Sequence, residues 1–173
     1  LLVVARIPDT SLDAIATRIP AEPLLLVLEA VEKPGNLGAV LRTADGAGVD
    51  GVLVADPRTD PWNPNAIRAS MGTVFSVPLA VVDASTAREW LRMRGVRTVA
   101  TVVDASTSYT EADLTGAVAI ALGSEADGLS EAWRGPGVSS VRIPMRGIAD
   151  SLNLSASAAI LAYEARRQRD GPG

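Results

Sequence analysis

Three polar, glycine-containing segments hold most of the side chains that could do chemistry in this sequence. They are residues 32–42 (EKPGNLGAVLR), 123–130 (GSEADGLS) and 143–157 (IPMRGIADSLNLSAS). Each follows a predicted strand, and ligands of parallel α/β sheets bind beyond the carboxyl ends of the strands. None has the G-x-G-x-x-G or P-loop pattern of dinucleotide and nucleoside-triphosphate sites. The pattern predicts an α/β enzyme whose ligand site is built from three loops.

The first two segments offer one cation and one carboxylate to such a ligand. Gly38 and Arg42 are one helical turn apart, so that Asn36, Gly38 and Arg42 could all face one site. Alternatively, Asn36 only caps a helix and Arg42 is an ordinary solvated side chain. Glu125 stands between two glycines, which permit unusual backbone angles and the close approach of a ligand. A plain strand-to-helix turn would have a similar sequence.

The third segment is unusual because it mixes apolar residues with glycine and proline. Its apolar side chains indicate a loop that is buried or lines a pocket. Four hydroxyl and amide side chains then crowd one helix start, where capping needs only one of them. The alternative is a capped helix above a tucked loop. The apolar residues are Pro144, Met145, Ile148 and Leu152, and the polar ones are Ser151, Asn153, Ser155 and Ser157.

Composition limits the chemistry that these segments can perform. The chain has 173 residues, enough for one domain with a substantial core, and contains no Cys and no His. Thiolate nucleophiles, imidazole acid–base catalysis, disulfides and most zinc sites are therefore excluded, and we expect no metal. No apolar run approaches the ~20 residues that span a bilayer, and no secretory signal is evident, so we expect a cytoplasmic protein. The net charge of −4 argues mildly against an extensive nucleic-acid surface.

Alternating strand-like and helix-like segments must position the three loops. The predicted N-caps of the first three helices are Asn36, Asn63 and Ser85. Strands separated by helices predict a mostly parallel sheet with helices on both faces. Strands are expected at residues 24–28, 51–55, 76–82, 96–103, 117–122 and 138–143, and helices at residues 37–47, 64–71, 86–94 and 152–169.

The first 23 residues do not follow this alternation. Residues 1–7 are apolar, Asp9 or Thr10 could cap a short helix that runs to Thr17, and Pro20 and Pro23 then interrupt the chain. We interpret residues 1–23 as a linker or as the tail of a preceding module. Residues 24–169 form the expected catalytic domain, and residues 170–173 a short tail.

Taken together and in order, the three segments resemble the signature motifs of the SpoU (TrmH-like) family of SPOUT RNA 2′-O-ribose methyltransferases. The matching stretches are PGNLGAVLRTADGAGVDGVLV, IALGSEADGLS and IPMRGIADSLNLSASAAILAYE. A fourth stretch, AIRASMGTVFSVPL, is similar to the family's Ser-Gly-Pro segment. The resemblance runs from residue 24 to about residue 167, which is nearly the whole chain.

This resemblance implies a fold, a cofactor and a quaternary structure. The fold would carry a C-terminal trefoil knot, an exception to the usual absence of knots. The cofactor would be S-adenosyl-methionine, held within the knot by the second and third motifs. The protein would be a homodimer, with Arg42 of one subunit near the methyl donor of the other. Carried over by position, the donor-binding residues are Leu122, Gly123, Ile143, Met145 and Leu152, with Thr101 nearby.

The implied reaction transfers a methyl group to a ribose 2′-hydroxyl. This hydroxyl is a poor nucleophile and needs either proton removal or a positive charge beside the developing alkoxide. The resemblance points to Arg42 for this task. A base role would require a depressed arginine pKa, at about 1.4 kcal/mol per unit, whereas electrostatic stabilisation requires none. A phosphate or a water would then accept the proton.

The other candidate catalytic residues have supporting roles under the same resemblance. Asn36 would hold the backbone of the target nucleotide, and Glu125 would order the loops around Arg42 and the donor. Ser151 and Asn153 would position the ribose or fix the donor loop.

The resemblance implies that residues 1–23 are a linker or the tail of an N-terminal RNA-binding module. Ribosomal RNA is therefore the favoured substrate, because family members that act on it often carry such a module. The alternatives are a tRNA 2′-O-methyltransferase, a non-catalytic RNA-binding paralogue and an unrelated small-molecule α/β enzyme. A paralogue without activity would be expected to lose Arg42 or the third motif, and this sequence retains both.

Overall fold

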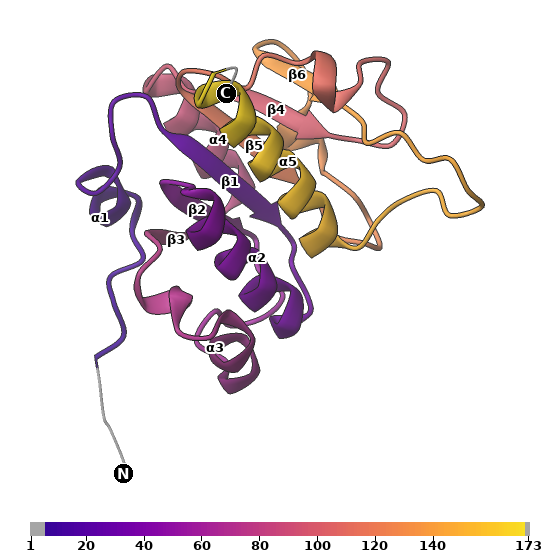
Figure 1. Cartoon of the computed structure of the whole chain (residues 1–173). Helices are drawn as coiled ribbons and strands as arrows, with labels where there is room; N and C mark the ends of the chain where they lie inside the picture. The colour runs from indigo at the N-terminus through magenta and orange to yellow at the C-terminus, as the bar shows by residue number, and fades with distance from the viewer. Residues whose placement is uncertain (1–5, 172–173) are drawn as a thin grey trace.

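The computed structural model describes residues 6–171 and is built on a six-stranded sheet in which neighbouring strands all pair in parallel (Figure 1). The spatial order is β3-β2-β1-β5-β4-β6. The carboxyl ends of all six strands therefore lie on the same side of the sheet, where the three polar segments emerge. The strands are β1 (Leu24–Glu29), β2 (Gly51–Ala55), β3 (Leu79–Val82), β4 (Arg97–Thr101), β5 (Val118–Leu122) and β6 (Val138–Val141).

Helices cover both faces of this sheet, as predicted. α2 (Pro34–Ala47) and α5 (Leu154–Arg169) pack on one face, and α1 (Leu12–Ala16) and α4 (Ala84–Met93) on the other (Figure 1). α3 (Pro64–Ser70) packs against α2. Three short 3-10 turns, η1 (Thr73–Phe75), η2 (Tyr109–Glu111) and η3 (Glu131–Trp133), lie in the connections.

The central strand β1 shows why the strands are apolar throughout. Leu24, Leu26 and Leu28 enter the core beneath α2 and α5, whereas Leu25 and Val27 enter the core beneath α4. Successive side chains of a strand point to opposite faces, so a strand covered on both faces buries every residue.

Most helix boundaries differ from the predicted ones by one to three residues, because a neighbouring residue provides the cap. α2 begins at Pro34, with Lys33 rather than Asn36 at the N-cap, since proline fits the first helical position. Asp83, not Ser85, caps α4 by accepting from the Thr86 N–H. Ser11, not Asp9 or Thr10, caps α1, and Asn153 caps α5, which begins at Leu154. Asn63 caps α3 as predicted.

Three strands are shorter than predicted by two residues or more. The predicted strand at residues 76–82 keeps only its second half, because residues 73–75 form a 3-10 turn that Ser76 ends in a helical conformation. β4 ends at Thr101 and β6 at Val141. The remaining residues of these apolar runs, Val102 and Ile143 among them, pack only partly against the core.

Residues 10–16 also cover the sheet. Ile15 of α1 is buried in the core beneath α4, and the Thr10 carbonyl accepts from Val81 N–H of β3 at 2.9 Å. The interpretation of residues 1–23 as the end of an RNA-binding module stays a prediction, and residues 1–5 lie outside the described part of the chain.

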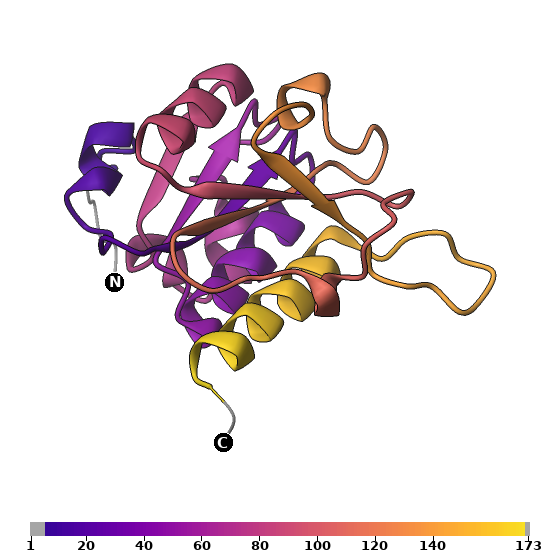
Figure 2. The same cartoon turned by 90° about the horizontal axis from the view of Figure 1, so that it is seen from above.

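The chain after β6 returns from the edge of the sheet to its centre. Arg142 N–H donates to the Thr107 carbonyl (2.9 Å), and the Arg142 carbonyl accepts from Tyr109 N–H (3.0 Å). Residues 143–153 then extend away from the sheet before α5 packs against β1, β5 and α2 (Figures 1 and 2). The third motif is thereby brought beside the carboxyl end of β5, although β6 is an edge strand.

Candidate functional site

A cavity of about 480 Å³ lies at the carboxyl ends of β4 and β5 and beneath the start of α5. This volume is within the range of sites that enclose small organic ligands. Its wall includes all six residues that the sequence assigned to the methyl donor, namely Thr101, Leu122, Gly123, Ile143, Met145 and Leu152. The structure therefore brings the predicted donor residues together around one space.

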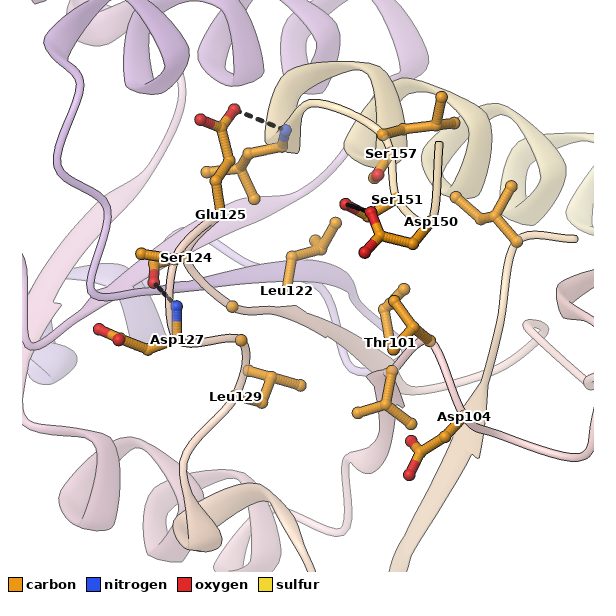
Figure 3. Close-up of a pocket in the computed structure, with 18 of the residues that line it drawn as sticks. Thr101, Asp104, Leu122, Ser124, Glu125, Asp127, Leu129, Asp150, Ser151 and Ser157 are labelled. Carbon is orange, nitrogen blue, oxygen red and sulfur yellow. Dashed lines mark hydrogen bonds between the residues drawn. The ribbon is translucent and has the colours of Figure 1, made fainter. Parts of the chain in front are cut away.

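The cavity combines apolar and polar walls. Figure 3 shows Leu122 of β5, Thr101 of β4 and Ser151 of the third motif around the same space. The Thr101 hydroxyl oxygen is buried and has no hydrogen-bond partner within residues 6–171. Leaving a buried hydroxyl unpaired costs about 1–3 kcal/mol, which a polar ligand group at this position would offset.

The loop of residues 123–130 closes one side of the cavity. Ser124 ties it into a tight turn, since its carbonyl accepts from Gly128 N–H and its hydroxyl from Asp127 N–H, both at 3.0 Å (Figure 3). The return limb of the loop, residues 128–130, passes directly over Gly123. A Cβ atom at Gly123 would lie 2.0 Å from the Gly128 carbonyl carbon.

This geometry corrects the predicted reason for Gly123. We expected the missing side chain to let a ligand approach the backbone. Instead, it lets the loop's own return limb approach, and that limb forms a wall of the cavity through Gly128 and Leu129.

The Glu125 carboxylate joins the three polar segments in one hydrogen-bonded cluster. It accepts from Lys33 Nζ (2.6 Å), Asn36 Nδ2 (3.1 Å) and Asn153 Nδ2 (2.5 Å). Asn153 Nδ2 also donates to Asn36 Oδ1 (3.2 Å). The hydrogen bond from the Lys33 ammonium is the largest cause that holds the pKa of Glu125 below its usual value. The carboxylate is thus kept ionised, as an acceptor for all three side chains.

Lys33 is a member of this cluster that the sequence did not identify as a site residue. The available signal was that it is the only lysine and directly precedes the first motif. The Lys33 side chain is 67% exposed and its ammonium lies beside Glu125, where it could also contact a phosphate.

Arg42 lies apart from the cavity of its own chain. Its side chain is exposed on α2, does not line the cavity and forms no salt bridge within the described residues. The structure therefore gathers Asn36, Glu125 and Asn153, and separately Ser151 on the cavity wall, but leaves Arg42 outside.

The prediction for the third segment is only partly right. Ile143, Met145 and Leu152 line the cavity, but Ile148 at the tip of the extended loop is fully exposed. Apolar residues of this loop thus indicate the cavity wall only near its two ends, where β6 and α5 hold the chain near the sheet.

Neither a metal site nor a membrane span is found in the part of the chain that the structure describes. Residues 6–171 contain no group of His, Cys, Asp or Glu side chains that could hold a metal ion. In the same range, none of the helices combines the length and the apolar character needed to cross a bilayer.

The sequence model of the SpoU rRNA Methylase family matches residues 23–163, which hold the cavity, the Glu125 cluster and Arg42. The chain belongs to this family. The 23S rRNA (guanosine-2′-O-)-methyltransferase RlmB of Burkholderia sp. is 38% identical to this SpoU chain over 172 residues, which cover 96% of the chain and 70% of the relative.

Solved structures support the same membership. A crystal structure of an RNA 2′-O ribose methyltransferase has 48% identity and a TM-score of 0.82, covering 87% of the SpoU chain and 58% of the other. The SpoU methyltransferase AviRb from Streptomyces viridochromogenes, in complex with AdoMet, has 32% identity and a TM-score of 0.88, covering 96% and 67%. The SpoU chain thus spans about 60–70% of the length of these relatives.

The cofactor of the SpoU chain is S-adenosyl-methionine, and the cavity residues fit it. Leu122, Ile143 and Leu152 offer an apolar surface to an adenine ring. The unpaired Thr101 hydroxyl and that of Ser151 offer hydrogen bonds to its polar groups.

Proposed function

We propose that this SpoU chain transfers a methyl group from S-adenosyl-methionine to a ribose 2′-hydroxyl of ribosomal RNA. The observation that carries the proposal is the donor cavity next to the Glu125 cluster, where all three motifs meet. The RlmB relative of Burkholderia sp., which by name acts on a guanosine of 23S rRNA, favours ribosomal RNA over tRNA. With this substrate the protein would work in the cytoplasm.

The residues of the cluster, together with Ser151, bind and orient the target nucleotide. Asn36 and Asn153 are held by Glu125, so their amides are fixed in orientation before RNA arrives. Preorganised groups of this kind lower the cost of reaching the reactive geometry. Lys33 offers a point charge to a backbone phosphate, and Ser151 a hydroxyl to the ribose.

Arg42 is the proposed catalytic cation. When bound, S-adenosyl-methionine supplies an electrophilic methyl group. The guanidinium stabilises the negative charge that develops on the attacking 2′-oxygen, and a phosphate or water accepts the proton. Since Arg42 lies outside the cavity of its own chain, it would act at the donor site of a second copy.

Such a second copy is expected to cover the surface formed by α2 and α5. Ala156, Ala159, Ile160 and Tyr163 of α5 remain at least partly exposed there, and Tyr163 lies beside Gly46 of α2. Ala158, Leu161 and Ala162 of the same helix are buried within their own chain and would not contact the second copy.

The chain is expected to be a homodimer at micromolar concentration. Its catalytic cation lies outside its own donor cavity, so a complete active site needs a second copy. Light scattering coupled to size-exclusion chromatography would give twice the monomer mass. A monomer mass at the same concentration would contradict both the dimer and the shared active site.

We also propose that the chain carries the C-terminal trefoil knot that the family resemblance implies. The pairing of Arg142 with Thr107 and Tyr109, followed by the return of α5 to the centre of the sheet, supports it. Residues 1–23 would continue into an RNA-binding module that contributes to target choice.

Methyl transfer itself is expected when the chain is incubated with S-adenosyl-methionine carrying a labelled methyl group and with ribosomal RNA. Mapping of 2′-O-methyl positions should show label on a ribose of ribosomal RNA and little on tRNA. Failure to bind S-adenosyl-methionine in calorimetry would indicate an unrelated small-molecule enzyme. Donor and RNA binding without transfer would indicate a non-catalytic paralogue.

A further inference from the structure

Glu29 is the only fully buried charged side chain in residues 6–171, with 3% of its surface exposed. It is the last residue of β1, next to the carboxyl end of β5, where Leu28 pairs with Leu122. It neither lines the donor cavity nor belongs to the Glu125 cluster. Burying a carboxylate is costly unless hydrogen bonds compensate it, so its partners indicate what it does.

Both carboxylate oxygens of Glu29 accept hydrogen bonds from one residue. Ser130 N–H donates to Oε2 at 2.7 Å, and Ser130 Oγ donates to Oε1 at 2.5 Å. These two residues are 101 positions apart in sequence. Hydrogen bonds to an ionised acceptor are roughly twice as strong as neutral ones.

Ser130 ends the return limb of the 123–130 loop, so Glu29 fixes where that limb lies. The limb crosses Gly123 at backbone contact distance, and Gly128 and Leu129 form part of the cavity wall. Leu129 is 7% exposed and packs into the core beneath α4. The position of this wall therefore depends on the packing of Leu129 in the core and on the hydrogen bonds between the Glu29 carboxylate and Ser130.

The ion pairs that hold the outer part of the same loop are exposed. Lys33 pairs with Glu125, and Arg58 with Asp127 at 2.7 Å, all with substantially exposed side chains. Exposed ion pairs contribute little and are screened by salt. The Glu29–Ser130 contact is screened less than these ion pairs, because the Glu29 side chain is buried.

We propose that Glu29 is a positioning residue that holds the 123–130 loop, through Ser130, in the shape that binds the methyl donor. The inference rests on the proposed function, because it assigns that loop to S-adenosyl-methionine. Without the anchor, only a fraction of molecules has the binding shape. The apparent dissociation constant then rises by the inverse of that fraction.

Two substitutions at Glu29 separate hydrogen bonding from charge and volume. Glu29→Met keeps a side chain of similar size but no acceptor of this kind, and is expected to weaken S-adenosyl-methionine binding roughly tenfold in calorimetry. Glu29→Gln can accept from Ser130 N–H and donate to its Oγ, so it should retain affinity within about threefold. In methyl-transfer assays, Glu29→Met should raise the KM for the donor, with little change in the KM for RNA or in kcat at saturating donor.

Ser130→Ala tests the same contact from the other side. Ser130 is exposed, so the variant should fold, and loss of one of the two hydrogen bonds should weaken donor binding roughly threefold. Combining it with Glu29→Met should cause no further loss, because both changes remove the same contact.

Asp50→Ala is the matched control, because Asp50 ties the opposite end of the same strand. Its Oδ2 accepts from Leu24 N–H at 2.8 Å, far from the cavity. This variant should lower the melting temperature but leave donor affinity unchanged. Equal losses of affinity in Asp50→Ala and Glu29→Met, or wild-type affinity in both Glu29→Met and Ser130→Ala, would overturn the inference. Absence of donor binding by the unaltered chain would instead refute the proposed function.

Discussion

Arg42→Ala is expected to lower the rate of methyl transfer by roughly 100- to 1000-fold, the usual cost of losing one group that stabilises transition-state charge. Donor affinity should stay within a few-fold, because Arg42 does not line the cavity of its own chain. Calorimetry with S-adenosyl-methionine and single-turnover transfer to ribosomal RNA measure the two effects separately. A combined loss of donor affinity and rate would assign Arg42 to binding instead.

Arg94→Ala provides the control for loss of positive charge. Arg94 is an exposed arginine that follows α4 on the opposite face of the sheet and stacks on Trp90. Its removal changes the net charge equally but should leave the transfer rate within about twofold, because exposed charges far from a site are screened. If both variants lost activity to the same extent, the effect of Arg42 would be one of overall charge.

Gly123→Ala is expected to weaken the binding of S-adenosyl-methionine on the order of 100-fold. Even one methyl group at this position would meet the Gly128 backbone, so the return limb of the 123–130 loop must move and the cavity wall with it. Calorimetry measures the loss, and a melting curve shows whether the domain remains folded. Normal donor affinity in a folded variant would place the donor elsewhere.

Gly35→Ala is the matched control for this substitution. Gly35 lies in the first turn of α2, and a Cβ atom there would have no neighbour within 4 Å. Alanine has the higher helix propensity, so this variant should fold normally and keep its donor affinity. A loss in both variants would show that donor binding is sensitive to any added side chain in these segments.

The two inactive variants together test whether the active site is shared between subunits. In a mixed dimer, the Arg42→Ala subunit contributes an intact cavity and the Gly123→Ala subunit an intact Arg42. One of the two composite sites is then complete. Equal mixing with subunit exchange should restore about a quarter of the wild-type activity, since half the dimers are mixed. No recovery would mean that Arg42 acts on the donor of its own chain.

The sequence by itself determined the layers of the fold, and it predicted six residues that line one cavity of the structure. Apolar runs such as residues 24–28, separated by helices, predict a parallel sheet that is covered on both faces. The structure confirms this sheet. The cavity residues were predictable because the ends of parallel strands hold the ligand site, and because the motifs resemble those of the SpoU family. Leu122, for example, ends β5, and Gly123 directly follows it.

Only the tertiary structure decided how the motifs meet. β5 inserts between β1 and β4, so Leu28 pairs with Leu122 and the first motif lies beside the second. Strand order depends on long-range packing, which no local pattern encodes. For this reason, the cluster of Lys33, Asn36, Glu125 and Asn153 contains a hydrogen bond between residues 117 positions apart. The same long-range packing buries Glu29 against Ser130, brings the return limb over Gly123 and leaves Arg42 outside the cavity of its own chain.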